Sequence, residues 1–281
     1  MAVLDRKIDF ALVFSVKNAN PNGDPLSGNM PRITIDGSGE LSDVCLKRKI
    51  RDRLQEAGDP IFVQSDDNRS DEYKSLKDRA EKTLGDAMKD EKKLRETACK
   101  TWIDVRSFGQ LFAYKGEKSG SGVSVGIRGP VSIQSAFSVD PINITSIQIT
   151  KSVSGEGDGT KKASDTMGMK HRVDFGLYAT YGSMNPQLAE RTGFSYEDAL
   201  KIKQALLHIF DNDASSARPE GSMEVISLYW WEHNSKSGQY SSAKVHRSLF
   251  IKPKVEKPQS TDDYDIVVTQ LEGLKPEVLA Y

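Results

Sequence analysis

The segment from Phe10 to Arg53 constrains the fold most strongly, because an apolar strand, a tight polar turn and a basic helix follow one another in it. The strand FALVFSV is typical of a buried sheet element. Residues 18–25 are rich in Asn, Gly and Pro, which form turns. Ser42 or Asp43 can cap the helix that follows. A sheet edge, a shaped loop and a cation-bearing helix could together hold a phosphate backbone.

The helix of this segment has an apolar stripe and a dense set of cations. The stripe is formed by Leu46, Ile50, Leu54 and Ala57. Residues 47–53 contain five cations and one acid, and Lys47, Arg48 and Arg51 lie at different angles from the stripe. Two interpretations remain open for these cations. They form either a solvated helix surface or a track for phosphates.

The charge of the whole chain limits the kind of nucleic-acid site that it can carry. The 281 residues have a formal net charge of -1 at pH 7, whereas a freestanding, non-specific nucleic-acid binder usually has a large basic excess. Any phosphate site is therefore local. The N-terminus is charged and no apolar run approaches the roughly 20 residues that span a bilayer, so we expect a cytoplasmic protein without membrane contact. Cys45 and Cys99 lack a metal-ligand spacing, and we expect no metal or cofactor.

The rest of the chain supplies further elements in a definite order. Residues 65–100 are charged and helix-prone without core character, residues 116–129 form a glycine-rich flexible loop, and residues 142–149 alternate as one arm of a hairpin. The predicted strands lie at 102–105, 123–137, 173–181, 223–231, 244–251 and 264–268. Ser195 opens the best amphipathic helix.

The main elements follow the order strand, helix, strand, strand, helix, strand, with two insertions. This order predicts an α+β fold of the ferredoxin-like or RNA-recognition-motif type, in which two helices cover one face of an antiparallel sheet. The first insertion is helical and follows the first helix, and the second is a hairpin between the second and third strands. The fold alone does not decide the function, because many functions use it.

Four motifs carry a resemblance to a known family. They are residues 14–25, 30–32, 43–51 and 169–178. Together they resemble the backbone subunit of the CRISPR Cascade complex, specifically its type I-C branch. The resemblance extends from about Asp9 to the C-terminal strands.

The resemblance implies a hand-shaped protein. The palm would be a single domain over residues 1–281 with a modified RNA-recognition-motif fold, with a helical fingers insertion at 58–107 and a thumb hairpin at 140–170. Such subunits polymerise as copies along the CRISPR RNA, displace a base at each thumb and present the guide for pairing with target DNA. The subunit would not be an enzyme. Its partners would also include the guide-processing handle-end subunit, the large subunit and the small subunit.

The resemblance also implies a set of residues that contact RNA. The palm candidates are Asn20, Asn22, Arg32, Lys47, Arg48, Arg51, Phe108, Gly109, Gln110, Gln134 and Ser135. The thumb candidates are Met167, Met169, Lys170, His171 and Arg172, of which the methionines could wedge beside a displaced base. Each has a structural alternative: the asparagines could simply form a turn, the methionines could be hairpin packing, and His171 could be a structural histidine.

Two other functions compete with this one. Backbone subunits of type III CRISPR complexes resemble the same fold and cut RNA with an acidic loop residue, so Asp24, Asp36 or Asp43 could bind a divalent metal as a nuclease centre. A turn role for Asp24 and a capping role for Asp43 count against this alternative. A generic interaction module could instead dock partners through residues 65–100.

Overall fold

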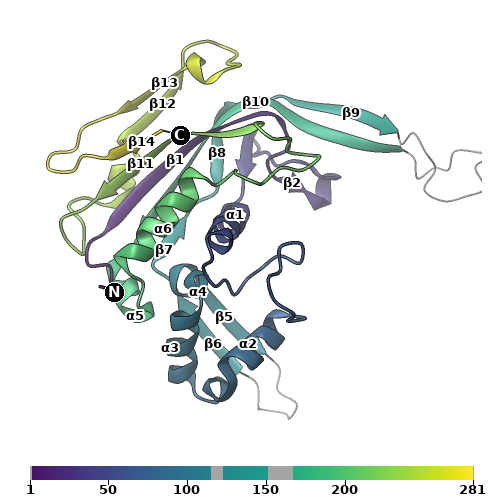
Figure 1. The fold of residues 1–281 in the computed structure, drawn as a ribbon. Helices are drawn as coiled ribbons and strands as arrows, with labels where there is room; N and C mark the ends of the chain where they lie inside the picture. Colours follow the sequence, from purple (N-terminus) through teal and green to yellow (C-terminus); the bar gives the residue numbers. More distant parts are fainter. Residues whose placement is uncertain (1, 115–122, 151–166, 281) are drawn as a thin grey trace, which may run out of the picture.

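The computed structural model describes residues 2–114, 123–150 and 167–280 (Figure 1). Its main sheet has the strand order β14-β11-β1-β10-β8-β4, and β7 and β9 also pair with β10. These strands are β1 (Ile8–Ala19), β4 (Ser38–Leu41), β7 (Val131–Ile133), β8 (Ala136–Pro141), β9 (Ile144–Thr150), β10 (Met167–Met184), β11 (Met223–Glu232) and β14 (Glu277–Leu279). None of the described helices is long and apolar enough to cross a membrane.

Strand β1 lies at the centre of the sheet, because it is apolar on both faces. It pairs antiparallel with β10 from Ile8 to Ala19 and with β11 on its other side. Phe10 and Leu12 belong to one core cluster, whereas Ala11 and Val13 belong to another. The predicted strands at 10–16, 173–181 and 223–231 are therefore confirmed, and β1 is buried on both faces. The predicted strand at 123–137 is wrong as a single element, because it divides into Val123–Arg128, which pairs in a separate sheet, β7 and the start of β8.

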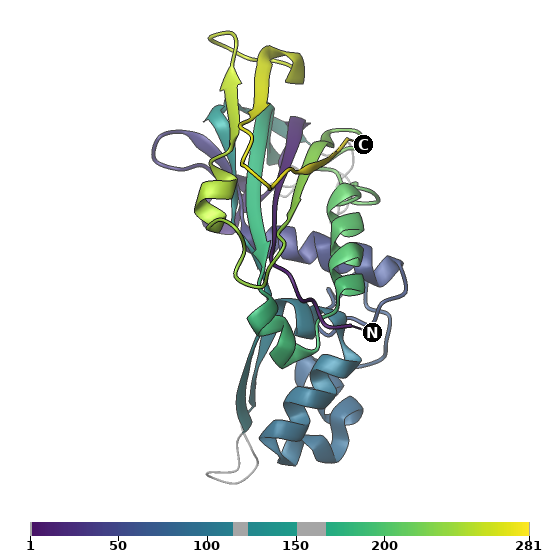
Figure 2. The same cartoon turned by 90° about the vertical axis from the view of Figure 1, so that its left-hand side faces the viewer.

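Helices α1 (Asp43–Glu56) and α6 (Tyr196–Leu207) cover one face of this sheet, as Figure 2 shows. Ser42 caps α1 by accepting a hydrogen bond from the Cys45 amide, and Ser195 forms a capping box with Asp198 at the start of α6. Both predicted helices and their predicted starts are thus confirmed.

The C-terminal segment covers the opposite face. It contains α7 (Ser242–His246), β12 (Leu249–Pro253) and β13 (Tyr264–Val268), and the last two pair as a separate hairpin. Val245 and Leu249 pack with Trp231 of the main sheet. The predicted strand at 244–251 is therefore wrong in its first half, where Ser241 caps a short helix and directs Val245 into the core.

The segments between Ile61 and Arg128 form what we call the helical module. Its elements are α2 (Leu76–Leu84), η2 (Gly85–Lys89), α3 (Glu91–Thr101), α4 (Ile103–Phe108), β5 (Gly109–Tyr114) and β6 (Val123–Arg128). Figure 1 places them below the main sheet. Leu84, Leu94 and Phe112 share a buried cluster of their own, so the expectation that this region lacks a core is wrong.

Two further expectations for this module need correction. The predicted strand at 102–105 is the start of α4, because Ile103, Asp104 and Val105 are all buried by tertiary contacts that override the β propensity of the sequence. The predicted loop at 116–129 ends in strand β6, which pairs with β5. Its remaining part, 116–122, lies outside the described residues. The proposed insertion boundary at 107 stays a prediction.

A two-stranded hairpin projects from the main sheet. Its strands are β9 and the first part of β10, paired from Val173↔Ile144 to Met167↔Thr150. Figure 1 shows it extending away from the helices, and we call it the projecting hairpin. The predicted pairing of the two arms is confirmed. The glycine-rich segment 154–159 and Lys161 and Lys162 lie outside the described residues.

Candidate nucleic-acid interface

The loop between β1 and α1 is held by two asparagines that use their side chains inside the protein. Asn20 is buried, and its Nδ2 donates to the Asn29 carbonyl at 2.7 Å. Its Oδ1 is buried without a hydrogen-bond partner among the described residues. The Asn22 Oδ1 accepts from the Ser42 amide at 3.0 Å. These two predicted contact residues therefore shape the loop directly.

The N-terminus of α1 is closed by neighbouring side chains. The Ser42 amide donates to the Asn22 Oδ1. The Asp43 amide donates to the Ser135 Oγ at 3.3 Å, and the Cys45 amide donates to the Ser42 Oγ at 3.3 Å. Three orphan amides of the helix are thus satisfied within the protein. This geometry brings the loop, the helix and the segment before β8 to one place, and Ser135 acts there as a connector.

The three cations of α1 differ in their surroundings. Lys47 pairs with Asp43 at 2.9 Å and Arg48 pairs with Asp52 at 3.3 Å, and all four side chains are partly exposed. Arg48 also donates to the Val63 carbonyl at 3.0 Å. Such partly exposed pairs hold their charges weakly, so Lys47 and Arg48 remain available to an anion.

Arg51 is committed to the interior. Its Nε donates to Asp104 at 3.0 Å, and this carboxylate is fully buried. The guanidinium also lies 5.1 Å from the ring centre of Phe108. Arg51 and Phe108 therefore meet each other, and together they join α1 to α4.

Arg32 lies on the loop, 3.5 Å from Asp24, with 36% of its side chain exposed. Its Nε is buried without a hydrogen-bond partner among the described residues. Since the ion pair is long, the guanidinium keeps donors for a further acceptor. Arg32 is a half-buried cation beside the closed end of α1.

Three other predicted residues have backbone roles. Gly109 opens β5 with φ +83, and Gln110 pairs with Ile127 across the β5–β6 hairpin. The Gln134 amide donates to the Tyr181 carbonyl at 2.9 Å while its side chain is exposed. Gln134 and Ser135 therefore lie together, whereas Gly109 and Gln110 belong to the helical module.

The projecting hairpin carries the other candidates. Met167 and Met169 are 63% and 55% exposed, and Ile147 and Ile149 of the facing strand are also exposed. Met167 and Met169 are paired with Thr150 and Gln148, so they lie on the opposite face of the hairpin from the two isoleucines. Hairpin packing therefore does not bury these methionines among the described residues.

The base of this hairpin carries three titratable side chains. The His171 Nδ1 lies 2.7 Å from the Ser146 Oγ, Arg172 lies 3.9 Å from Asp174, and Lys170 is half-buried. All three sit on β10 just before it joins β1 in the main sheet. They are separated from Lys47 along the fold, so the candidates form a palm group and a hairpin group.

The acids proposed for a nuclease centre have local structural roles. Asp24 caps a short 3-10 turn, η1 (Pro25–Ser27), and Asp43 pairs with Lys47. A hydrogen bond from the Thr34 hydroxyl, with further ones from backbone amides and Ser38, holds the pKa of Asp36 below its usual value. Among the residues that the structure describes, no group of three or more His, Cys, Asp and Glu side chains is placed to hold a metal ion.

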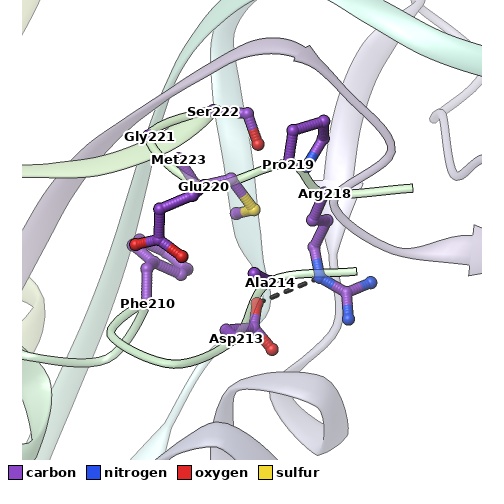
Figure 3. Close-up of a pocket in the computed structure, with 9 residues that line it drawn as sticks. All are labelled: Phe210, Asp213, Ala214, Arg218, Pro219, Glu220, Gly221, Ser222 and Met223. Carbon is purple, nitrogen blue, oxygen red and sulfur yellow. Dashed lines mark hydrogen bonds and ion pairs between the residues drawn. The ribbon is translucent and has the colours of Figure 1, made fainter. Parts of the chain in front are cut away.

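The loop between α6 and β11 contacts the loop between β1 and α1, which carries Asn20 and Asn22. Figure 3 shows Asp213 and Arg218 of this loop facing each other, 3.0 Å apart. Asp213 also pairs with the buried Lys49 of α1. The Ala217 carbonyl accepts from the Asn20 amide at 2.9 Å. No local sequence pattern points to Asp213 or Arg218, because Asp213 pairs with Lys49 across a long stretch of chain.

A cavity next to Lys47 includes another cation, Arg128, which is not among the residues predicted to contact RNA. The cavity has a volume of about 380 Å³, and Phe108 and Arg128 also line it. Arg128 is the last residue of β6 and is exposed. Gly129 and Pro130 directly follow Arg128, and such a pair indicates the end of a strand. This local pattern could have marked Arg128 as a strand-end cation.

Comparisons with known proteins find a family model, a curated relative and chains of solved complexes that are similar to this chain. A relative from Haloferax volcanii, "CRISPR-associated protein Cas7", is 26% identical over 234 residues, which are 77% of this chain and 67% of the relative. A chain of a "CRISPR RNA-guided surveillance complex, pre-nicking" is similar with a TM-score of 0.48 and 15% identity, over 80% of this chain and 78% of that chain. A chain of a "CRISPR RNA-guided surveillance complex" has a TM-score of 0.44 and 17% identity, over 80% and 68%. The family model described as CRISPR-associated protein Cas7 matches residues 6–269, and the chain therefore belongs to the Cas7 family.

Proposed function

We propose that this protein is a non-catalytic backbone subunit of a CRISPR RNA-guided surveillance complex of type I-C, and that it binds the phosphate backbone of the CRISPR RNA. The observation that carries the proposal is the family match over residues 6–269. The type I-C assignment rests on the resemblance of residues 14–25, 30–32, 43–51 and 169–178.

The topology supports a modified RNA-recognition-motif palm. Strands β11, β1, β10 and β8 lie side by side, and they are the fourth, first, third and second strands of the strand-helix-strand-strand-helix-strand order. Helices α1 and α6 lie on one face. The other face is covered by the C-terminal segment, so the RNA would lie at the α1 side and along the sheet edge instead of on the open sheet face used by ordinary members of this fold.

The contacts within the site suggest a division of labour among the candidate residues. Asn20, Asn22, Ser135 and Arg51 hold the loop, the helix end and α4 in place. The cations that remain accessible are Arg32, Lys47, Arg48, Lys170 and Arg172. Phosphate oxygens would accept from these donors without regard to base sequence.

The projecting hairpin supports a role in shaping the guide. Met167 and Met169 expose flexible apolar side chains, which could fill the gap beside a displaced base. A subunit that repeats along RNA needs a narrow cationic track and a nearly neutral surface elsewhere, which agrees with the net charge of -1. Further copies of this chain, the other subunits of the complex and target DNA paired to the guide are the partners that we propose.

The test is co-expression of the full chain with a repeat-spacer transcript. We expect a large particle that contains RNA and several copies of the chain, because each copy would bind one stretch of backbone. Size-exclusion chromatography with light scattering measures the mass and nucleic-acid content. Elution as an RNA-free monomer would contradict the proposal.

A matched pair of variants tests where the RNA lies. Lys47→Ala combined with Lys170→Ala should weaken assembly for all spacer sequences alike and flatten its dependence on salt. Lys89→Ala combined with Lys92→Ala removes the same charge from exposed side chains of the helical module and should leave assembly unchanged.

A further inference from the structure

The cavity beside Lys47 differs in the charge of its lining from four other surface cavities. It lies where α1, α4, β6, β7 and the end of β10 meet, and its lining contains two cations, Lys47 and Arg128, and no carboxylate. Four other surface cavities each include at least one Asp or Glu in their lining. Asp43 pairs with Lys47 at 2.9 Å but does not line the cavity. A concave surface whose lining has two cations and no acid is suited to an anion.

Arg128 is placed at this cavity by the β5–β6 hairpin. Val125 and Ile127 of β6 point into the core of the helical module, so Arg128 points out of it. Its partner in the register is Gly109, which has no side chain to cover it. The structure gives Arg128 no ion pair with any described residue, so its guanidinium is available to a ligand.

Two glycines fix the backbone near Arg128: Gly109, its partner on the neighbouring strand, and Gly129, the next residue in the chain. A Cβ on Gly109 would lie 2.2 Å from the Ile127 carbonyl oxygen, and a Cβ on Gly129 would lie 2.2 Å from the Ser107 carbonyl oxygen. Only glycine allows this close crossing of α4 and β6. The crossing holds the backbone of Arg128 in one place. Less conformational entropy of this residue is therefore lost when a ligand binds.

The remaining wall of the cavity offers neutral polar groups. Ser132 of β7 pairs with Ser183 of β10, and both line the cavity. The Asn185 Oδ1 accepts from the Gln187 amide at 2.8 Å, which orients its amide group at the same wall. Hydroxyl and amide groups beside two cations match the oxygens of a sugar-phosphate backbone.

We propose that this cavity binds a phosphodiester of a single-stranded nucleic acid, with Arg128 and Lys47 as its cationic contacts. The inference rests on the proposed function and extends its RNA track toward the helical module. The track connects the start of α1 with the cavity. Lys47 lies one helical turn after Asp43, whose amide donates to Ser135. Ser135 in turn follows Ser132 of the cavity lining by three residues in the chain. The guide RNA and the target strand share this chemistry.

The experiment compares Arg128→Ala with Arg247→Ala in the full chain, since both arginines are exposed and Arg247 lies on the far C-terminal segment. Binding of a labelled single-stranded RNA is measured by fluorescence anisotropy over a series of salt concentrations. Arg128→Ala should reduce the slope of log affinity against log salt by about 0.7, the value for one lost phosphate contact on a single strand. Arg247→Ala should keep the slope of the unmodified chain.

A second arm identifies the source of the phosphodiester. Each variant is assembled with guide RNA, and binding of complementary DNA is then measured in the same salt series. A loss in the RNA arm assigns the cavity to the guide, and a loss confined to the DNA arm assigns it to the target strand. Equal slopes for Arg128→Ala and Arg247→Ala in both arms would overturn the inference. Failure of the unmodified chain to bind RNA would instead overturn the proposed function.

Discussion

Single residues on α1 show how one helix can carry cations with different tasks. Lys47 and Arg48 pair with acids one turn away at partly exposed positions. Arg51 pairs with the fully buried Asp104, which also accepts from the Phe62 amide at 2.8 Å and the Val63 amide at 3.0 Å. Removing one partner of such a buried network leaves polar groups without water or protein partners.

We expect Asp104→Ala to lower the free energy of unfolding by about 3–5 kcal/mol, because it leaves a buried guanidinium and two amides unpaired. Arg51→Ala should cost a similar amount, and the double variant should cost less than the sum of the two. Lys47→Ala should cost less than about 1 kcal/mol. Urea denaturation measures all four. An Arg51→Ala variant as mild as Lys47→Ala would contradict this assignment.

The difference between Arg51 and its neighbours could be predicted only in part. The pairs of Lys47 with Asp43 and of Arg48 with Asp52 follow from helical spacing. The partner of Arg51 lies on another element, within a segment that the sequence predicts as a strand. A long-range contact of this kind depends on the tertiary structure, and no local pattern encodes it.

At the scale of elements, the start of α6 has two functions. Asp198 completes the capping box with Ser195, and it also accepts two hydrogen bonds from Arg106 of α4, at 3.0 and 2.7 Å. Burial raises the pKa of Asp198, but the hydrogen bonds from Arg106 and Ser195 outweigh burial and hold that pKa below its usual value. One carboxylate therefore ties the helical module to the helix layer of the main sheet.

We expect Asp198→Asn to lower the free energy of unfolding by about 1–3 kcal/mol at pH 7, since it removes charge-assisted hydrogen bonds. Because the folded state has the lower pKa, this stabilisation is present above the usual value of 3.8 and disappears as the pH falls through the folded pKa. The deficit of the variant should therefore shrink in acid. Thermal unfolding between pH 7 and pH 3 checks this, with the exposed Glu197→Gln as control. A deficit that stays constant would contradict it.

Elements with a strong local signal were predicted well, and elements fixed by burial were not. The cap at Ser42, the capping box at Ser195 and the alternation in residues 142–149 are local, and the structure confirms the helices and the hairpin pairing. Helix α4 was missed because its β-branched residues favour a strand locally. Burial of consecutive side chains against two clusters favours the helix.

At the scale of the whole molecule, three apolar clusters divide the described chain. One lies between the main sheet and α1 and α6, one lies under the C-terminal segment, and one lies within the helical module. The sequence predicted the first cluster through its apolar stripes. It could not predict that the C-terminal segment covers the other face of the sheet. Apolar residues on both sides of a strand indicate that both faces are buried, but they do not identify the covering segment.

We expect amide hydrogen exchange to divide along these clusters. The helical module has its own core, and its contacts with the rest include Ile103, the ion pairs of Arg51 and Arg106, and the hydrogen bond from Arg48 to the Val63 carbonyl. Its amides should open at a lower free energy than those of β1 and β10. Mass spectrometry of exchange measures this. Equal opening energies throughout would contradict the division.

The path of the chain through these clusters has a consequence for synthesis on the ribosome. The helical module is one uninterrupted stretch, so all of its core side chains have been synthesised once Arg128 has been added. The main sheet is different, because β1 is synthesised first and pairs with β10 and β11, which are synthesised late. A nascent chain would thus carry a folded module while its apolar β1 still lacks both neighbours. The interval between Ala19 and Met223 is when this protein most needs a chaperone.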